Sequence, residues 1–418
     1  MKRKREFQVL VVGAGPVGMV TALKLGLAGI PTRIIDKETD PTTRSGACAI
    51  HPHSMQIFSE LGMVQAILDA GHRIDVMAFY DGADRKAELN LANLRLEFPF
   101  AVALPQSVLE RLLEAELKRI KVPIEWNHWL TKVDFSGKKP KGTIAKMAMN
   151  STGIIMAETD YFVDSETEIE PEFIIATEGI RSNIRDALQI ELESYGPREL
   201  FTHCDFQIEC DAGHEARFQL ENDGTGAFWP LPNRMARWSI QTFPNMVSLD
   251  FVEKERSPFV VEKSAQDIAR FADRMRHTAP WFEYPISEID WLIEVPFEPR
   301  LAVRFGENRC WLAGDCAHQV SPIGMQGMNA GFIEAVQLSD QIEAILRNGA
   351  PLTSLNTYSQ VSHSRIESLL CKSESPAGVD WMKNRWSRIV CCLPALGSDL
   401  DLFTRQLRIE NAPALAFK

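Results

Sequence analysis

The segment Phe7–Asp36, FQVLVVGAGPVGMVTALKLGLAGIPTRIID, decides the fold of the first part of the chain. Within it, Val9–Val12 is an apolar run with the length of a buried strand, and Ile34 and Ile35 begin to repeat that pattern. The residues between these runs predict a helix that ends before Gly29. The segment therefore predicts a strand, a helix and a second strand in one continuous unit.

The turn between the first strand and the helix carries three glycines in G-x-G-x-x-G spacing. One glycine permits a tight turn, one lets the backbone approach a pyrophosphate, and one allows the helix to pack closely on the strand. The helix N-terminus offers free N–H groups and the positive end of its dipole to phosphates. The acid that closes the second strand is placed to bind a ribose. Together these features predict an adenine dinucleotide site at Gly13, Ala14, Gly15, Pro16, Val17, Gly18, Asp36 and Lys37.

Composition limits the classes of function. The 418 residues suggest two or three domains, and the net charge of −11 argues against general binding to nucleic acid or anionic membranes. We find no apolar run of about 18 residues, so no membrane span is predicted. None of the eight cysteines forms a C-x-x-C pair, which favours a reduced, cytoplasmic setting without zinc. The His51-Pro52-His53 sequence fits a helix start better than a metal site, because no acid or cysteine accompanies it.

The rest of the chain predicts a second domain inserted into the first. Phe173–Ala176 and Cys310–Ala313 are further buried strands, and residues 138–172 read as an antiparallel meander added to the parallel sheet. Residues 73–100 and 199–241 are rich in short β-like runs. The predicted dinucleotide-binding domain comprises residues 1–72, 103–186 and 291–350, the β-sheet domain comprises residues 73–102 and 187–290, and residues 351–418 form a helical C-terminal segment.

Two further motifs follow buried strands. The second motif is ATEGIRSNIR at residues 176–185, and the third is GDCAHQVSPIGMQGMNAG at residues 314–331. In the third motif a strand brings Asp315 to its carboxyl end, where open α/β sheets bind ligands. Pro322 stiffens the loop, Gly327 allows a flat ring to come close to the backbone, and the helix beginning near Gln326 points its N–H groups at that ring.

The order and separation of the three motifs resemble those of the single-component FAD-dependent aromatic hydroxylases, the para-hydroxybenzoate hydroxylase-like flavoprotein monooxygenases. The resemblance covers roughly residues 7–350 and implies an α/β fold. That fold has a Rossmann-like FAD-binding domain of mixed parallel sheet and antiparallel meander, a β-sheet substrate domain and a helical C-terminus. It also implies FAD contacts at Gly314, Asp315, Pro322, Gly327, and the backbone of Met328 and Asn329, with Arg44 and Gln106 at matching positions. The simpler alternatives are a solvated loop charge for Arg44 and a polar helix-start residue for Gln106.

The second motif departs from the family pattern. Glu178 stands where the family has Asp, and Ala176 stands where it has Gly, whereas Ser182 and Arg185 match. The family uses this motif for both FAD and nicotinamide contacts, so the longer side chain of Glu178 puts the usual nicotinamide dependence in question. The simpler interpretation is that the Glu178 carboxylate makes the same contacts as the family's Asp, with its backbone lying slightly further from them.

The resemblance also implies a reaction. NADPH or NADH reduces FAD, reduced FAD takes up O₂ to give a C4a-hydroperoxide, and the distal oxygen passes to a small aromatic or similarly electron-rich substrate. The β-sheet domain would exclude water, and we predict Phe228, Trp229 and Pro230 as substrate-lining residues, with ordinary sheet core as the alternative. No acid–base residue is identified, and the chain is predicted to be a monomer or a homodimer.

Two other functions remain open. A FAD-dependent reductase on the same fold would not need O₂, and a FAD-binding protein without turnover would be consistent with the departure at Glu178. Oxygen uptake with NAD(P)H and a panel of phenols separates all three. A flavin halogenase is not expected, because the sequence has no W-x-W-x-I-P motif.

Overall fold

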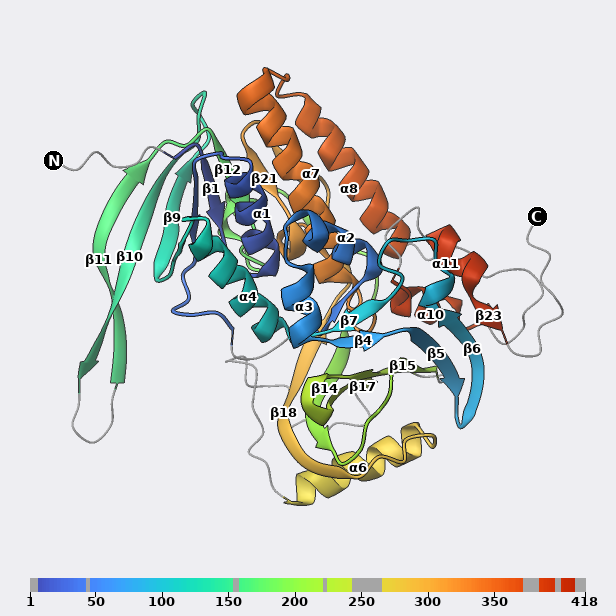
Figure 1. Cartoon of the computed structure of the whole chain (residues 1–418). Helices are drawn as coiled ribbons and strands as arrows, with labels where there is room; N and C mark the ends of the chain where they lie inside the picture. The colour runs from blue at the N-terminus through green and yellow to red at the C-terminus, as the bar shows by residue number, and fades with distance from the viewer. Residues whose placement is uncertain are drawn as a thin grey trace.

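A six-stranded sheet organises the first part of the molecule (Figure 1). The computed structural model describes residues 7–42, 46–152, 158–220, 224–242, 265–370, 383–394 and 400–409. All of the sheet's strands are parallel except β20, which runs antiparallel to its neighbour. The strands, in sheet order, are β20 (Gly306–Glu307), β21 (Cys310–Leu312), β12 (Phe173–Ala176), β1 (Val9–Val12), β2 (Thr32–Ile35) and β8 (Ile124–Glu125).

The predicted strand–helix–strand unit lies at the centre of this sheet. Every residue of β1 is buried, as expected for a strand covered on both faces. Helix α1 (Pro16–Leu27) starts with proline in its first turn, where a missing N–H costs nothing, and Gly29 ends it with a φ of +71°. The chain then returns as β2, directly beside β1. The sequence prediction of this unit is confirmed.

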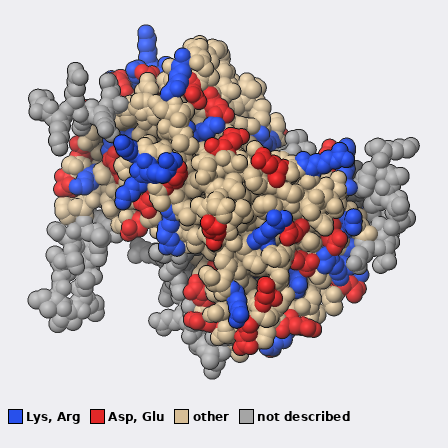
Figure 2. Space-filling model, viewed as in Figure 1, with Lys and Arg blue, Asp and Glu red and all other residues tan. Residues whose placement is uncertain are grey.

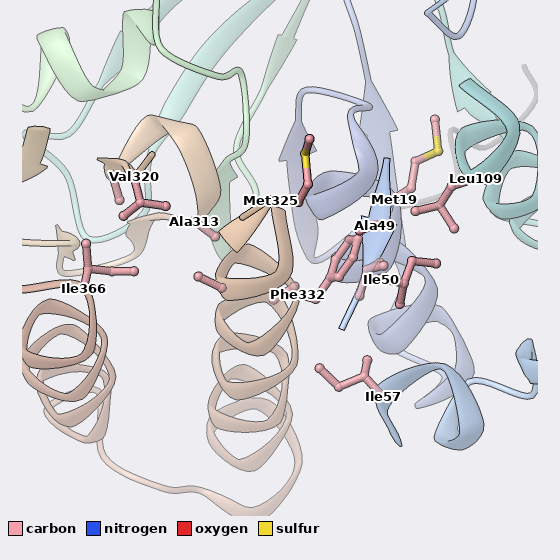
Figure 3. Close-up of a cluster of buried hydrophobic side chains, with 14 of the residues drawn as sticks. Met19, Ala49, Ile50, Ile57, Leu109, Ala313, Val320, Met325, Phe332 and Ile366 are labelled. Carbon is pink, nitrogen blue, oxygen red and sulfur yellow. The ribbon is translucent and has the colours of Figure 1, made fainter. Parts of the chain in front are cut away.

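Helices cover one side of the sheet and an antiparallel meander covers the other (Figure 1). The helical layer contains α1, α4 (Gln106–Arg119) and α7 (Gln326–Asn348), with α8 (Ser354–Leu370) packed on α7. Figure 3 shows Met19, Leu109 and Phe332 pointing into one apolar core from three of these helices. The meander consists of β9 (His128–Asp134), β10 (Lys141–Thr152) and β11 (Glu158–Ile169), as predicted.

Short elements connect this layer to the rest of the chain. One small sheet holds β3 (Ala49–Ile50), β7 (Ala101–Ala103) and β4 (His72–Ile74), and another holds β13 (Leu192–Ser194), β19 (Arg300–Ala302) and β22 (His318–Gln319). Three short helices, α2 (Pro52–Glu60), α3 (Val64–Ala70) and α5 (Asn183–Ala187), complete this part.

A second sheet of eight strands lies below the first part in Figure 1. In order, it contains β18 (Ile286–Phe297), β14 (Glu199–Ile208), β17 (Met235–Thr242), β16 (Thr225–Pro230), β15 (Glu215–Leu220), β5 (Val76–Asp81), β6 (Asp84–Asn90) and β23 (Arg408–Ile409). Both predicted segments of the second domain contribute strands. Strand β18 runs across the predicted boundary at residue 290, and β23 comes from the C-terminal segment. The division into domains stays a prediction.

The two faces of the eight-stranded sheet have different neighbours. Helix α6 (Ala265–Thr278) packs on one face, where Phe206, Phe228 and Trp238 form a separate apolar cluster with it. The opposite face joins the main core through Phe218 and Trp229. This second face is therefore the one turned towards the six-stranded sheet.

The C-terminal segment adds helices α10 (Trp386–Cys392) and α11 (Leu400–Gln406). The predicted fold class is confirmed, with the addition of the short strand β23, which the sequence did not indicate. On the face shown in Figure 2, acidic and basic side chains of the described residues alternate without a large area of one sign. None of the helices in the described ranges has the length and apolarity that crossing a membrane requires.

Candidate cofactor site

The glycine-rich turn leaves open space at one of its three glycines. A side chain at Gly13, where φ is +104°, would overlap the backbone of Thr177, and one at Gly18 would lie 2.6 Å from the Thr177 hydroxyl. By contrast, a Cβ atom at Gly15 would meet no atom within 4 Å. Two glycines therefore let the turn pack on the second motif, and Gly15 leaves room for a ligand to approach the backbone.

Asp36 lies beside this turn. Its Oδ2 accepts a hydrogen bond from the Ala14 N–H at 2.5 Å, and its Oδ1 accepts one from the Glu38 N–H at 2.8 Å. Each carboxylate oxygen has a further acceptor position, so Asp36 can also bind ribose hydroxyls. Lys37 follows it with an exposed side chain. Ribose binding by Asp36 stays a prediction.

Glu178, the residue that departs from the family pattern, caps a helix. Its Oε2 accepts hydrogen bonds from the Ser182 hydroxyl at 2.6 Å and from the Ile184 N–H at 3.2 Å, at the start of α5. Burial raises the pKa of Glu178, although these hydrogen bonds oppose the rise. The side chain thus satisfies free donors of the helix N-terminus.

The second motif also contacts the third. Arg185 is buried, and its Nη1 donates to the carbonyl oxygens of Ile180 at 2.8 Å and Cys316 at 3.3 Å. The Thr177 hydroxyl lies 2.9 Å from the carbonyl oxygen of Val12, at the end of β1. These contacts hold the loops after β1, β12 and β21 together at the carboxyl ends of neighbouring parallel strands.

Val17 joins the third motif to the first. This side chain stands in the first turn of α1, 3.1 Å from where a Cβ atom of Gly314 would lie and 2.5 Å from that of Gly331. Any larger residue at Gly331 would push α7 away from α1. Gly314 has a φ of +69°, and its N–H donates to Oε2 of the buried Glu334 at 2.8 Å.

Asp315 and Gly327 border the same space. Asp315 is reached by solvent, yet the surrounding protein atoms raise its pKa, with Glu334 adding to the rise and His318 opposing it. A Cβ atom at Gly327 would lie 3.8 Å from Asp315 Oδ1 and 3.4 Å from Val320. Asp315 therefore presents an accessible carboxylate beside a glycine at the start of α7, where a polar ligand can approach the backbone.

A buried ion pair supports the Asp315 turn from behind. His318 Nε2 lies 2.9 Å from Glu334 Oε1, and neither side chain is exposed. Burial alone would lower the pKa of His318, but Glu334 raises it above its ordinary value.

Asn329 uses its whole side chain within the protein. Its Oδ1 accepts hydrogen bonds from the His51 N–H at 2.8 Å and the Ser54 hydroxyl at 2.7 Å, and its Nδ2 donates to Ala49 O at 2.9 Å and Met325 O at 2.7 Å. A primary amide can make four such bonds, so none remains for a ligand. Any cofactor contact of Asn329 is therefore left to its backbone, as the family resemblance implies.

Comparison with known proteins gives the same assignment as the three motifs. Residues 6–373 match the family model described as "FAD binding domain". The chain belongs to this family. Its sequence is 24% identical over 392 residues to para-nitrophenol 4-monooxygenase from Pseudomonas sp. (strain WBC-3), covering 90% of this chain and 87% of that protein. It is also 24% identical over 355 residues to 6-methylpretetramide 4-monooxygenase from Streptomyces rimosus, covering 84% of this chain but 58% of that longer protein.

Solved structures show the same fold. The crystal structure of p-nitrophenol 4-monooxygenase from Pseudomonas putida DLL-E4 superposes with a TM-score of 0.72 at 19% identity and covers 96% of each chain. The prediction that the chain is a FAD-dependent aromatic hydroxylase-like flavoprotein is confirmed at the level of the family and the fold. The open backbone at Gly15 and the enclosed carboxylate of Asp315 fit the pyrophosphate and sugar parts of FAD.

The remaining predicted FAD contacts lie near this site or outside the described residues. Gln106 begins α4, accepts a hydrogen bond from the Ala47 N–H at 3.1 Å and donates to Glu110 at 2.8 Å. Arg44 belongs to residues 43–45, which the structure does not describe. Pro322 and Met328 are half-buried in the third motif. The roles of these four residues in FAD binding stay predictions.

The C-terminal helix α10 covers the third motif, which sequence reasoning missed. The side chain of Gln326 donates to the carbonyl oxygens of Val390 at 2.9 Å and Leu393 at 2.6 Å. A side chain at Gly324 would overlap the carbonyl group of Cys391. No motif marks α10 in the sequence, so only its apolar residues could have indicated that it is buried.

The three predicted substrate-lining residues do not share one environment. All of β16 is buried, but Phe228 stacks on Tyr284 with ring centroids 5.7 Å apart, on the face covered by α6. Trp229 lies on the opposite face and meets the Phe218 ring edge-on at 5.6 Å. Phe228 therefore fits the alternative of sheet core, and Trp229 alone of the two aromatic residues faces the FAD-binding region.

That same face carries a buried polar cluster that the sequence analysis did not identify. Arg237 forms a bidentate pair with Asp205, through Nε–Oδ1 at 2.6 Å and Nη2–Oδ2 at 2.7 Å. Its Nη1 donates to Gly46 O at 3.1 Å, which ties the sheet to the loop beside Gln106. Burial opposes the charge, but Asp205 raises the pKa of Arg237. Polar residues spaced two apart in otherwise apolar strands were the available signal.

Proposed function

We propose that this protein is a FAD-dependent monooxygenase that uses NADPH or NADH and O₂ to hydroxylate a small aromatic or similarly electron-rich molecule. The observation that carries the proposal is the meeting of three separated motifs at the carboxyl ends of β1, β12 and β21, with Val17 between Gly314 and Gly331. Ligands of open α/β sheets bind at this edge. The relatives include proteins named para-nitrophenol 4-monooxygenase and 6-methylpretetramide 4-monooxygenase.

The residues present suit each part of FAD. The pyrophosphate would lie against Gly15 and the N-terminus of α1, a ribose would bind Asp36, and the ribityl chain would bind near Asp315. The ring would meet the backbone at Gly327 and the residues that follow it. Bound FAD supplies the electron transfer and oxygen activation.

The protein itself would contribute charge stabilisation and exclusion of water. The first turn of α7 has N–H groups without partners inside the helix, and these favour negative charge at the edge of a neighbouring ring. The eight-stranded sheet presents a buried face with Trp229 and Phe218 towards the FAD-binding region. Such a cover keeps water from a reactive oxygen donor, so that oxygen reaches the substrate and is not lost as H₂O₂.

The proposed electron donor is NADPH or NADH, and its binding involves the second motif. The sequence has one glycine-rich fingerprint, so NADPH or NADH would have to reach the ring without a nucleotide-binding domain of its own. Glu178 is committed to the N-terminus of α5, where the family's Asp would also be close. We therefore propose that Glu178 is a tolerated variant and that the nicotinamide dependence is kept.

The deciding experiment measures FAD content and oxygen uptake of the purified protein. NADH and NADPH are each supplied with a panel of phenols that includes 4-nitrophenol, and hydroxylated product and H₂O₂ are quantified. Oxygen consumption coupled to product supports the proposal. Coenzyme oxidation that continues without O₂ consumption would instead show a reductase, and FAD binding with neither coenzyme oxidised would show a protein without this turnover.

The variant Gly327→Val tests whether the flavin ring lies against residue 327. The Cβ atom of the added side chain would make only ordinary contacts with Val320 and Asp315, so we expect the fold to survive. It would displace the ring and admit water, so we expect coenzyme oxidation to continue while product falls and H₂O₂ rises. Unchanged coupling in Gly327→Val would show that the ring does not lie there.

A further inference from the structure

His318 and Glu334 form an ion pair directly behind the turn that carries Asp315. His318 Nε2 lies 2.9 Å from Glu334 Oε1, and both side chains are fully buried. Removing two charges from water is so unfavourable that an apolar pair of similar volume often stabilises a protein as well or better. Packing alone therefore does not explain why two charged groups stand at this place.

Regular elements hold both members of the pair. His318 begins β22, just after Asp315, and it lies opposite Leu301 on the neighbouring strand β19. Glu334 belongs to α7, which is packed against α1 where Gly331 meets Val17. The two charged groups are thus held by secondary structure and not by loops, as a group that orients another side chain requires.

The Glu334 carboxylate joins His318 to the backbone of the turn. While Oε1 faces His318, Oε2 accepts a hydrogen bond from the Gly314 N–H at 2.8 Å. Gly314 has a φ of +69° and directly precedes Asp315. This hydrogen bond therefore fixes the backbone from which the Asp315 side chain extends.

The pair also acts on the charge of Asp315. Burial raises the pKa of Asp315, His318 lowers it, and Glu334 raises it. Burial lowers the pKa of His318, but Glu334 and Asp315 together raise it above its ordinary value, against a smaller opposing effect of Arg365. The protonated imidazole thus balances two carboxylates, which would otherwise be like charges that disfavour each other's ionisation.

An ionised Asp315 suits a ligand that carries hydroxyl groups. An ionised carboxylate accepts hydrogen bonds at both oxygens, and such charge-assisted bonds are stronger than those of the neutral acid. Asp315 is reached by solvent, and a Cβ atom at Gly327 would lie 3.8 Å from its Oδ1. The carboxylate is therefore open to a ligand on one side, while its charge is balanced by a group that solvent does not reach.

From these contacts we propose that His318 and Glu334 are positioning residues for FAD. Glu334 fixes the turn at Gly314, and the positive charge of His318 keeps Asp315 ionised for a hydrogen bond from a hydroxyl of the ribityl chain. This inference rests on the FAD site of the proposed function and not on its oxygen chemistry. Neither residue is a ligand of the cofactor in this role, and no proton or electron is transferred.

The test is a double-mutant cycle that measures FAD affinity. Full-length wild type, His318→Gln, Glu334→Gln and the double variant are stripped of FAD, and FAD is titrated back at pH 7 by its fluorescence. In His318→Gln the carboxylates of Asp315 and Glu334 lack their positive partner, so we expect Kd to rise at least about tenfold. The double variant has no charge left in the pair, and its glutamine oxygen can still accept from Gly314. Its Kd should return to within about threefold of wild type.

The variant Glu172→Gln is the matched control. Glu172 pairs with Arg309 at 3.0 Å and stands just before β12, at the opposite end of that strand from the second motif. Its loss removes a carboxylate from an ion pair without touching the Asp315 turn, so the Kd for FAD should stay unchanged. A rise as large as that in His318→Gln would show that the loss of any ion pair weakens FAD binding, and it would overturn the proposal.

A purely structural role of the pair predicts a different order of affinities. Removing both partners would then weaken FAD binding at least as much as removing one, because each substitution disturbs the packing. A double variant that binds FAD no better than His318→Gln overturns the proposal, as does an unchanged Kd in His318→Gln. The expected return of affinity in the double variant is the result that only charge balance explains.

A single variant with an unpaired buried charge can fail to fold, which thermal unfolding of the FAD-free proteins reveals. The double variant leaves no such charge, and the comparison then passes to it and to wild type. Nitrogen NMR of the histidine rings shows whether His318 carries two protons at about pH 6, with its signal identified by its loss in the double variant. Two protons in wild type and a Kd within about threefold in the double variant support the proposal. A neutral His318 or a larger rise in Kd overturns it.

Failure of the proposed function gives a separate result. If FAD affinity follows the expected order but no phenol is hydroxylated, only the oxygen chemistry is removed. If wild type binds FAD normally and the substitutions have no effect, only the role of His318 and Glu334 is removed. A wild type that binds no FAD removes both.

Discussion

Around Gly13, Gly15 and Gly314 the shape of the site comes from the backbone, whereas on the eight-stranded sheet it comes from side chains. A Cβ atom at Gly13 would overlap the Thr177 backbone, one at Gly314 would lie only 3.1 Å from Val17, and Gly15 instead leaves open space for a ligand. On the sheet, Asp205, Arg237 and His203 could be replaced without any change of backbone path. The first kind of site restricts the choice of residue, because the space at Gly13 admits no side chain. The second kind can be altered strand by strand, which is how one fold takes many substrates.

The two regions also differ in whether their residues contribute to ligand binding or to folding. Gly15 contributes nothing to packing and stands open for a ligand, whereas the pair of Asp205 and Arg237 is enclosed and joins two parts of the molecule through Gly46. Substitutions on the two sides should therefore affect different measurements. Changes at Gly15 should affect ligand binding, and changes at the pair should affect folding.

The largest expected effect is on folding, from Asp205→Ala. This change leaves the charge of Arg237 buried without its partner, and we expect a loss of about 3–5 kcal/mol in the free energy of unfolding. Urea denaturation of the FAD-loaded protein measures it. Glu125→Ala is the matched control, because Arg33 and Glu125 form a bidentate pair of similar length, 2.8 and 2.7 Å, in a more exposed position. That control should lose about 1 kcal/mol or less. Equal losses of stability in the two variants would show that the buried pair of Asp205 and Arg237 is no more important for folding than the more exposed pair.

The next effect is on ligand binding, from Gly15→Val. Because no atom lies within 4 Å of the new Cβ atom, the fold should be kept while FAD binding weakens at least about 100-fold, or about 2.7 kcal/mol. Flavin fluorescence titration measures the Kd. Gly13→Ala should do the opposite and destabilise the fold, by about 1–3 kcal/mol, since its Cβ atom would overlap Thr177. Full FAD occupancy in Gly15→Val would show that the pyrophosphate lies elsewhere.

A smaller effect depends on pH. The pKa of His203 is lowered to about 3, mainly by burial and also by Arg237. Between that value and the ordinary pKa of about 6.5, the unfolded chain binds a proton that the folded protein does not, so stability falls as the pH falls through this window. At pH 5 the loss from this residue is about 2 kcal/mol.

The variant His203→Leu isolates that contribution. The urea midpoint of unfolding should fall between pH 7 and pH 5 in both proteins, and the fall should be smaller in the variant than in wild type. Arg237 is the charged group that acts on the imidazole, and it is unchanged in this comparison. His51, whose pKa burial lowers to about 4, contributes equally to both proteins. An equal drop in both would show that His203 does not stay neutral.

The smallest expected effect is from Glu178→Asp. The shorter side chain restores the residue typical of the family but reaches less far towards Ser182 and Ile184. FAD should remain bound, and the rate of coenzyme oxidation should change by less than about tenfold, or about 1.4 kcal/mol in the barrier. Stopped-flow reduction by NADH and NADPH measures it. A wild type that reacts with neither coenzyme, beside a mutant that does, would contradict the idea of a tolerated variant.

The fold around the glycine-rich turn was predictable from the sequence, whereas the polar cluster on the eight-stranded sheet was not, and the roles of the individual FAD contacts stay predictions. Gly13, Gly18 and Gly314 are needed wherever this turn and this helix packing occur, so their spacing alone indicated the fold. His203 and Arg237 carry no such signal, because their partners Ser239 and Asp205 are more than 30 residues away and meet only through the register of β14 and β17. Phe228 and Trp229 show the same limit, since adjacent residues on a strand face opposite sides.

The position of α10 and β23 has a consequence for how the protein is made. Helix α10 covers the loop around Gly324, and β23 pairs with β6, more than 300 residues earlier in the chain. The ribosome adds about 5–20 residues per second. The glycine-rich turn therefore leaves the ribosome long before α10 has been synthesised. The nascent chain therefore has a dinucleotide turn but an uncovered third motif. Full retention of FAD is therefore expected only after α10 has left the ribosome and packed on this loop.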